Sequence, residues 1–224
     1  MTSPRDARQR TVTLAAALGL ILTLSLAACG GSSDASSTTT TTESTKIEGI
    51  VRPDPLQVGS VSLPQVAPDG KETPFAFKAD SGKLLFVAFG YTNCPDVCPT
   101  TLYDIKKARK KLGAQGDDVQ VAFATVDPER DTPEVINQYL GSFATDGHPL
   151  RTTDPKALTT AQDAFGITSQ VVKNDDGSTD VSHTARSFVV DDQGDVVVEW
   201  AFGVGADAMA HDLKLLLAQQ AKGS

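Results

Sequence analysis

Two cysteines separated by three residues, Cys94 and Cys98, are the side chains of this sequence with the clearest capacity for chemistry. The apolar run 84–89 precedes them and a helical pattern follows, so they stand where a strand passes into a helix. The positive end of a helix dipole and its unpaired N–H groups favour the thiolate form there. Such a pair can form a redox disulfide or bind a metal ion. The alternatives are a lone nucleophile with an inert neighbour and a stabilising disulfide, which is a weak use because so short a loop restrains the unfolded chain little.

The spacing of the two cysteines bears on the choice between redox chemistry and metal binding. Redox dithiols of the thioredoxin type usually enclose two residues, whereas three residues also allow both sulfurs to face one ion. Two thiolates are soft ligands that select Cu(I), while zinc and iron–sulfur sites normally need more of them. A Cu(I) site here would need a third donor, and imidazole is suited to that role.

Three histidines could supply the imidazole. His148 lies in a polar turn and His211 lies among polar residues of a C-terminal helix, so we expect both on the solvated surface. His183 comes shortly before an apolar strand, and in a sheet of this order its loop can lie at the same end as the cysteine loop. From its position alone, two roles for His183 are equally well supported: a hydrogen-bonded loop residue and a metal ligand.

The elements that must position these side chains alternate along residues 47–224. We expect strands at 58–63, 75–77, 84–89, 119–126, 167–173, 179–181, 186–190 and 196–201, and helices at 99–112, 133–143, 155–165 and 206–220. Thr132 is a typical N-cap, and Pro133 suits the first helical position. This order predicts one α/β domain with a mixed central sheet, helices on both of its faces and a strand extension at the N-terminal end.

The N-terminal residues are typical of a targeting signal. Arginines precede an uncharged apolar stretch, 11–28, and residues 26–29 look like a lipobox, the signal at which bacterial lipoproteins are cut before Cys29 and acylated on it. An uncleaved anchor helix is the alternative, but the stretch is slightly short for a membrane span. Residues 1–28 are therefore expected to be a signal peptide, and 29–46, rich in Ser and Thr, a disordered tether behind the lipidated Cys29. The domain would then lie at the extracytoplasmic face of the cell membrane, where thiols can be oxidised.

The charge of the chain excludes some classes of partner. The formal net charge is −8 at neutral pH, and removal of residues 1–28 takes away more arginines than acids. An acidic domain is a poor ligand for nucleic acid or anionic lipid. The acidic residues are scattered, and we interpret them as a solvated surface.

Three motifs together resemble the Sco (SenC) family. They are F-G-Y-T-N-C-P-D-V-C-P-T at 89–100, V-D-P-E-R-D-T-P at 126–133 and S-H at 182–183, in the family order within about residues 58–220. Members are thioredoxin-fold copper proteins of mitochondrial and bacterial membranes that help assemble cytochrome c oxidase. The resemblance implies that Cys94, Cys98 and His183 bind one copper ion per domain, as Cu(I) or Cu(II). It also implies that Asp127 is an acid near the site that is not a ligand; a turn or cap acid is the alternative.

The chemistry of this donor set agrees with the resemblance. Two thiolates and a neutral imidazole suit trigonal Cu(I) and leave the metal open for exchange. Protons compete for all three donors, so affinity should fall in acid. Oxidation to a Cys94–Cys98 disulfide would remove both sulfur ligands, and the redox state would control copper loading.

Three functions compete on this basis. The first is a monomeric, membrane-anchored protein, not an enzyme, that gives copper or electrons to the copper-containing subunit of cytochrome c oxidase. The second is an extracytoplasmic thiol–disulfide oxidoreductase. Such reductases place a cis-proline beside the cysteine loop, whereas this chain has His183 in that segment and no proline after Pro155. The third, a peroxidase of related fold, is the weakest because the cysteines are paired and accompanied by a histidine.

Overall fold

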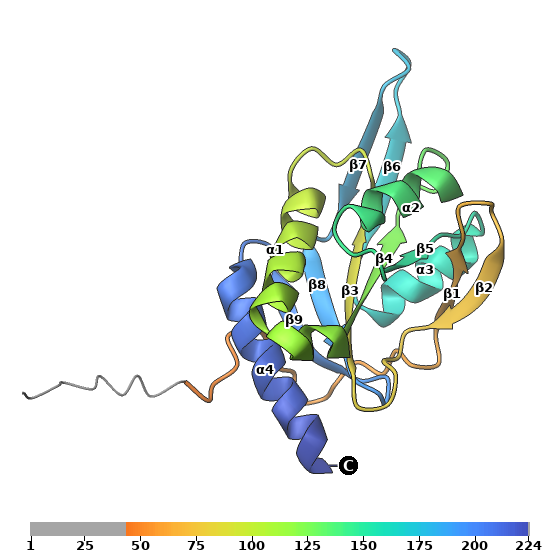
Figure 1. The fold of residues 1–224 in the computed structure, drawn as a ribbon. Helices are drawn as coiled ribbons and strands as arrows, with labels where there is room; N and C mark the ends of the chain where they lie inside the picture. The colour runs from red at the N-terminus through yellow and green to blue at the C-terminus, as the bar shows by residue number, and fades with distance from the viewer. Residues whose placement is uncertain (1–43, 224) are drawn as a thin grey trace, which may run out of the picture. The chain divides into compact units, whose positions relative to one another are not determined.

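A seven-stranded mixed sheet organises the domain, in the order β2-β1-β5-β4-β3-β8-β9 (Figure 1). The computed structural model describes residues 44–223, so the predicted signal peptide, Cys29 and most of the predicted tether lie outside the described residues. The strands of this sheet are β1 (Ser62–Val66), β2 (Glu72–Ala76), β3 (Leu84–Gly90), β4 (Val119–Thr125), β5 (His148–Leu150), β8 (Arg186–Val190) and β9 (Val196–Ala201).

Strands β3 and β4 form the centre of the sheet. All seven residues of β3 are buried, and the strand pairs parallel to β4 and antiparallel to β8. A strand covered on both faces reads as a continuous apolar run, which is the pattern seen at 84–89. The carboxyl ends of β3 and β4 lie at the same edge of the sheet, so the segments that follow Gly90 and Thr125 are neighbours in space.

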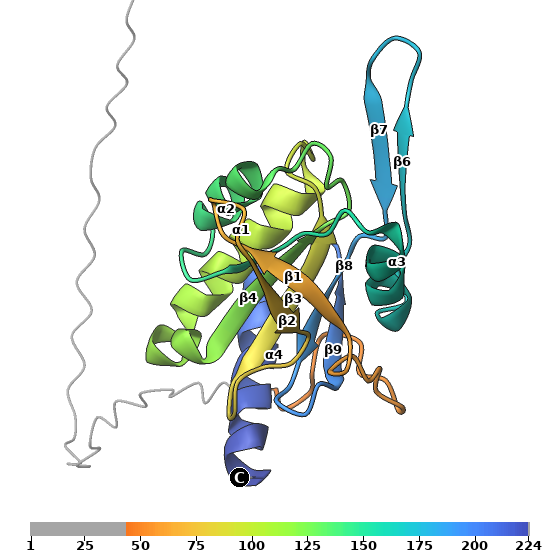
Figure 2. The ribbon, with the colours of Figure 1, turned by 90° about the vertical axis from the view of Figure 1, so that its right-hand side faces the viewer.

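Helices cover both faces of the sheet, as expected (Figure 2). They are α1 (Val97–Lys111), the 3₁₀ helix η1 (Gly113–Asp118), α2 (Pro133–Gly141), α3 (Pro155–Ala164) and α4 (Gly205–Gly223). Helices α1, α2 and α4 share one apolar cluster with one face of the sheet, whereas α3 contributes Ala161 to the cluster on the opposite face. This arrangement confirms the predicted α/β, thioredoxin-like fold. Within 44–223, no helix combines the length and the apolar character needed to cross a membrane.

Strands β6 (Ser169–Lys173) and β7 (Thr179–His183) form a separate two-stranded sheet. This hairpin projects from the body of the domain beyond the end of the main sheet, as both ribbon views show (Figures 1 and 2). The turn predicted at 174–177 is present, with Gly177 at a φ of 83° and a hydrogen bond from its N–H to the Asn174 carbonyl. The hairpin delivers His183 at the end of its second strand.

The two edges of the main sheet are closed in different ways. At one edge, β1 and β2 form an antiparallel hairpin in which Pro64 stands opposite Pro74. At the other edge, the segment before β1 lies along β9, through bridges from Ile50 to Glu199 and from Gln57 to Asp195. The N-terminal strand extension is therefore the β1–β2 hairpin beside β5.

Several predicted boundaries were wrong. Strand β1 begins at Ser62 instead of 58, and β2 covers Glu72–Ala76 instead of 75–77. The pairing register around the hydrogen-bonded turn at 67–71 sets these limits, with the Ala67 N–H donating to the Lys71 carbonyl. Strand β5 was not predicted at all, because its three residues are held by β4 and β1 and not by a local pattern.

His148 lies in β5 and is half-buried, whereas we expected it in a solvated turn. Its Nδ1 is 3.0 Å from Oε1 of Gln65, and its ring centroid is 4.6 Å from that of Phe75. Burial lowers the pKa of His148 below its usual value. The imidazole is therefore held neutral between two strands at neutral pH.

This burial predicts a loss of stability in acid. Below about pH 6.5, His148 takes up a proton more readily in the unfolded chain than in the folded one. The contribution of neutral His148 to the free energy of unfolding is therefore complete above about pH 6.5 and is lost as the pH falls below that value. His148→Phe keeps the ring contact with Phe75 and removes the titrating group. Urea unfolding at about pH 7.5 and about pH 5.5 should show a smaller difference in the variant than in the wild type. An unchanged difference would contradict the assignment.

Candidate metal centre

The two cysteines lie on either side of the start of α1. The helix begins at Val97, two residues earlier than predicted, so Cys98 belongs to its first turn and only Cys94 lies in the loop. The Asp96 side chain makes no capping hydrogen bond; instead, the Cys98 N–H donates to Cys94 Sγ at 3.4 Å. Pro99 still falls in the first turn, where its missing N–H leaves no carbonyl without a donor. The cysteine sulfur thus satisfies a free N–H at the start of the helix.

Cys98 is enclosed between the helix and the end of β3. The residue is buried, and a Cβ added at Gly90 would lie 2.6 Å from Cys98 Sγ and 3.0 Å from the Phe123 ring. Glycine at position 90 therefore provides the space that this sulfur occupies. Burial strongly raises the pKa of the Cys98 thiol. The expectation that the helix N-terminus favours a thiolate is wrong for Cys98, because burial is the largest cause of the raised pKa and exceeds the opposing effect of the backbone at Tyr91.

His183 reaches the cysteines from the projecting hairpin. Strand β7 extends to His183, two residues beyond its predicted end, and His183 pairs with Ser169 across the hairpin. Its Nδ1 donates to the Thr184 carbonyl at 3.1 Å, which leaves Nε2 with a lone pair. Nε2 is 3.6 Å from Cys98 Sγ, close enough to accept the thiol proton. Burial lowers the pKa of His183, so the ring is neutral, as a metal ligand must be.

The three expected donor atoms converge on one point. The ligand atoms of Cys94, Cys98 and His183 lie within 4.8 Å of one another, and they form the one such group of Cys, His and carboxylate donors found in residues 44–223. Three donors at about 2.0–2.3 Å from a common ion lie about 3.5–4 Å apart. The separation of Cys98 and His183 already has this value, so small movements suffice to place all three around one soft metal ion.

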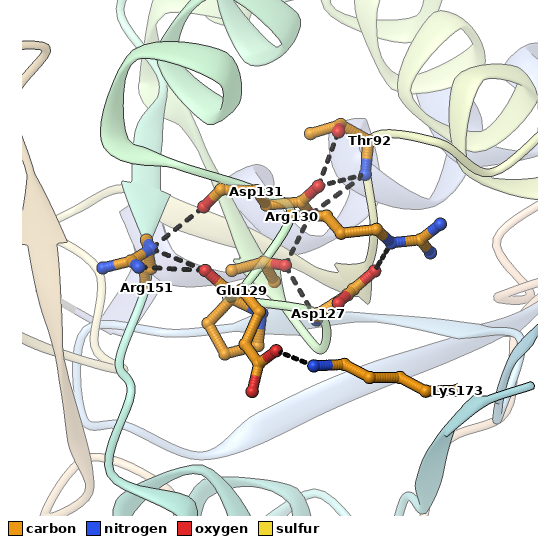
Figure 3. Close-up of polar contacts among 9 residues, drawn as sticks. Thr92, Asp127, Glu129, Arg130, Asp131, Arg151 and Lys173 are labelled. Carbon is orange, nitrogen blue, oxygen red and sulfur yellow. Dashed lines mark hydrogen bonds and ion pairs between the residues drawn. The ribbon is translucent and has the colours of Figure 1, made fainter. Parts of the chain in front are cut away.

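A buried carboxylate that sequence reasoning overlooked holds the cysteine loop. Asp131 has no exposed surface and accepts hydrogen bonds from the Thr92 N–H at 3.0 Å and from the hydroxyls of Thr92 and Thr125, both at 2.6 Å (Figure 3). Burial raises the pKa of Asp131 despite these donors. Its place in the motif at 126–133 was the available signal, but its partner Thr92 lies 39 residues away in the chain.

The loop that carries Asp131, which follows β4, is itself fixed by Arg151. Arg151, which follows β5, donates to the carbonyls of Pro128 and Asp131 at 2.9–3.1 Å (Figure 3). Asp127 is buried and forms an ion pair with Arg130. Asp127 is not a member of the converging donor group, and its expected influence on the site remains a prediction.

Comparisons with known proteins identify the family. The SCO1/SenC family model matches residues 66–218. A SCO2-like protein of Rickettsia prowazekii is 34% identical over 118 residues, which cover 50% of this chain and 56% of that protein. The structure of Bradyrhizobium japonicum ScoI with copper bound is 33% identical, with a TM-score of 0.58 over 68% of this chain and 96% of that one. Apo Sco1 from Thermus thermophilus is 32% identical, with a TM-score of 0.59 over 80% and 98%. The family model matches more than half of the residues of this chain, and the chain therefore belongs to the SCO1/SenC family.

Proposed function

We propose that this protein binds one copper ion through Cys94, Cys98 and His183 and helps assemble the copper centre of cytochrome c oxidase. The observation that carries the proposal is the convergence of two sulfurs and one neutral imidazole nitrogen within 4.8 Å. Two thiolates and an imidazole are soft donors that suit Cu(I). Three ligands leave a side of the ion open, through which a partner can take it.

The copper-bound ScoI structure supports the choice of metal. BsSco, whose structure shares the fold at 23% identity, is described as a member of a family of cytochrome c oxidase assembly proteins and carries a disulfide switch. In this chain Cys94 and Cys98 are both free thiols. Formation of a Cys94–Cys98 disulfide would consume both sulfur ligands, so an oxidant would release the metal and a reductant would restore the site. The copper-containing subunit of the oxidase is the proposed partner.

The proposed location is the extracytoplasmic face of the cell membrane, through a lipid on Cys29. The lipobox-like sequence at 26–29 supports this placement. Cys29→Ala should move the protein from the membrane fraction to the soluble fraction after cell lysis. Retention of the variant in the membrane fraction would favour an uncleaved anchor instead.

Thiol–disulfide exchange is the second candidate function. Cys94 is partly exposed while Cys98 is buried behind it, which is the asymmetry of a dithiol with one attacking and one resolving sulfur. The thiols of Cys94 and Cys98 would then reduce a disulfide of the oxidase subunit to two thiols before copper enters, and would themselves be oxidised to the Cys94–Cys98 disulfide. The two functions share the site and differ in whether copper or electrons pass to the partner.

Copper titration of the reduced chain tests the proposal. One Cu(I) per chain should bind, and mixing with the metal-free copper domain of the oxidase subunit should move the ion to that domain. Transfer of electrons without copper, seen as a Cys94–Cys98 disulfide in a chain that never held copper, would support the reductase function. Absence of copper binding by the fully reduced chain would refute the proposal.

Gly90→Ala should weaken copper binding without touching a ligand. The added methyl group would lie 2.6 Å from Cys98 Sγ and against Phe123, so the sulfur must move away from its present position. Displacing a ligand that is fixed by packing should lower Cu(I) affinity by about tenfold. Competition with a Cu(I) chelator measures the effect, and Gly141→Ala, where nothing lies within 4 Å of the new methyl group, is the matched control. Equal affinity of the two variants would contradict the prediction.

A further inference from the structure

We propose that Arg130 is a positioning residue of the metal centre, which acts through the ring of Tyr91 on His183 and Cys94. This inference rests on the proposed copper function and assigns a role to residues outside the ligand set.

The guanidinium of Arg130 lies between a buried acid and an aromatic face. Its Nε donates to Asp127 Oδ2, and Asp127 is 2% exposed. Its Cζ is 5.9 Å from the centroid of the Tyr91 ring. Its Nη2 is buried and has no hydrogen-bond partner within residues 44–223. A planar guanidinium that stacks on an aromatic ring gains a cation–π contact, which replaces part of the lost hydration.

Tyr91 in turn contacts two of the three ligand residues. Its ring stands at 89° to the His183 ring, with centroids 6.1 Å apart, which is an edge-to-face contact. Its carbonyl accepts a hydrogen bond from the Cys94 N–H at 3.2 Å. A displacement of Tyr91 would therefore move the imidazole of His183 through the ring contact. It would also move the cysteine loop through the backbone hydrogen bond.

His183 needs this support because of where it stands. The hairpin that carries it is not part of the main sheet. A second link between hairpin and loop, the ion pair of Lys173 with Glu129, joins two side chains that are each 68% exposed, and such exposed pairs contribute little. The Tyr91 ring is partly buried between the loop and the hairpin, so a cation fixed on its face limits how far the imidazole can move.

Arg130 could instead serve only to neutralise Asp127, and two variants separate these roles. Arg130→Lys keeps a positive charge beside Asp127 but loses the planar guanidinium. Tyr91→Leu removes the ring and leaves the Arg130–Asp127 ion pair. Positioning through the ring predicts that Arg130→Lys and Tyr91→Leu both impair the site, whereas neutralisation of Asp127 alone predicts that Arg130→Lys leaves it unchanged.

The first readout needs no metal. In the reduced, copper-free chain, Arg130→Lys and Tyr91→Leu should shift the NMR resonances of the His183 ring protons, because these report the position of the neighbouring ring. The second readout is Cu(I) affinity from chelator competition, which should fall by about tenfold in both variants, the usual effect of removing a group that orients a ligand.

Arg109→Lys is the matched control. Arg109 also forms an ion pair, with Asp146 at 2.6 Å, but it lies eleven residues beyond Cys98 on α1, about 16 Å along the helix axis. This variant should change neither readout. The inference is overturned if Arg130→Lys leaves both readouts at the wild-type value, or if Arg109→Lys changes them equally. Should Tyr91→Leu fail to fold, the comparison of Arg130→Lys with Arg109→Lys decides.

Failure of this inference differs from failure of the proposed function. If the wild-type chain binds no copper, the proposed function fails, and the shift of the His183 resonances still reports whether Arg130 positions the ring. If the wild-type chain binds copper and Arg130→Lys matches it in both readouts, only the positioning role fails.

Discussion

His183→Ala is expected to lower the Cu(I) affinity of the reduced chain by about 100-fold or more. The variant removes one of three converging donors, and the effect should exceed the 10–100-fold that follows loss of a group merely orienting a ligand. The two sulfurs remain, so a Cys94–Cys98 disulfide should still form and its reduction potential should still be measurable. Chelator competition measures the affinity, and equilibration with glutathione buffers measures the potential.

Two further variants frame this result. Cys98→Ser should abolish the disulfide and reduce copper binding together, because both depend on the buried sulfur. His211→Ala removes an imidazole whose Nε2 hydrogen-bonds to the Lys46 carbonyl and should behave as wild type in copper binding. Wild-type affinity in His183→Ala would argue for thiol–disulfide exchange as the function of the site.

Asp131→Ala is expected to lower the free energy of unfolding by about 3 kcal/mol or more. The substitution leaves the Thr92 N–H and the hydroxyls of Thr92 and Thr125 without their acceptor. Each buried donor left unpaired costs about 1–3 kcal/mol, and bonds to a charged acceptor are the stronger ones. Urea unfolding at neutral pH measures the loss, and the Cu(I) affinity of the folded variant should fall as well because Thr92 leads into the cysteine loop.

Asp131→Asn is the informative comparison. It keeps the volume and one acceptor oxygen but turns an amide NH₂ toward donors, so its stability should lie between those of wild type and Asp131→Ala. A value for Asp131→Ala within about 1 kcal/mol of wild type would show that water replaces the carboxylate. In that case Asp131 would not hold the loop.

The elements that were predicted well owe their limits to local chemistry. Strands β3 and β4 are buried on both faces, and their apolar runs marked them to within a residue. Helices α2 and α3 begin where expected, because Thr132 accepts from the Val135 N–H and Asp154 from the Lys156 N–H ahead of a proline at the first helical position. In these places the sequence pattern and the hydrogen bond involve the same few residues.

The elements that were missed depend on distant partners. At the start of α1, the Cys98 N–H donates to the sulfur of Cys94, and cysteine is not among the usual N-cap side chains. The position of His183 in the sequence did not decide whether it is a ligand. The residue lies on a hairpin outside the main sheet and contacts Cys98, which is 85 residues away in the chain. The resemblance to the Sco family supplied this pairing, and the geometry agrees with it. Asp131 was overlooked for the same reason, because its partner Thr92 belongs to another loop.

The closed edges of the main sheet affect whether copies of this protein can aggregate by strand addition at high concentration. The Pro64 carbonyl accepts a hydrogen bond from the Arg151 N–H on the β5 side. Pro74, which stands opposite Pro64, therefore directs its backbone nitrogen toward the outer edge of β2, and this nitrogen has no N–H to donate. At the β9 edge, two bridges from the segment before β1, at Glu199 and Asp195, already interrupt the row of backbone groups that another chain would pair with. Neither border offers an uninterrupted ladder for templated strand addition, the route by which exposed sheets aggregate. We therefore expect the borders of the main sheet not to start cross-β fibrils in concentrated solutions of the folded domain.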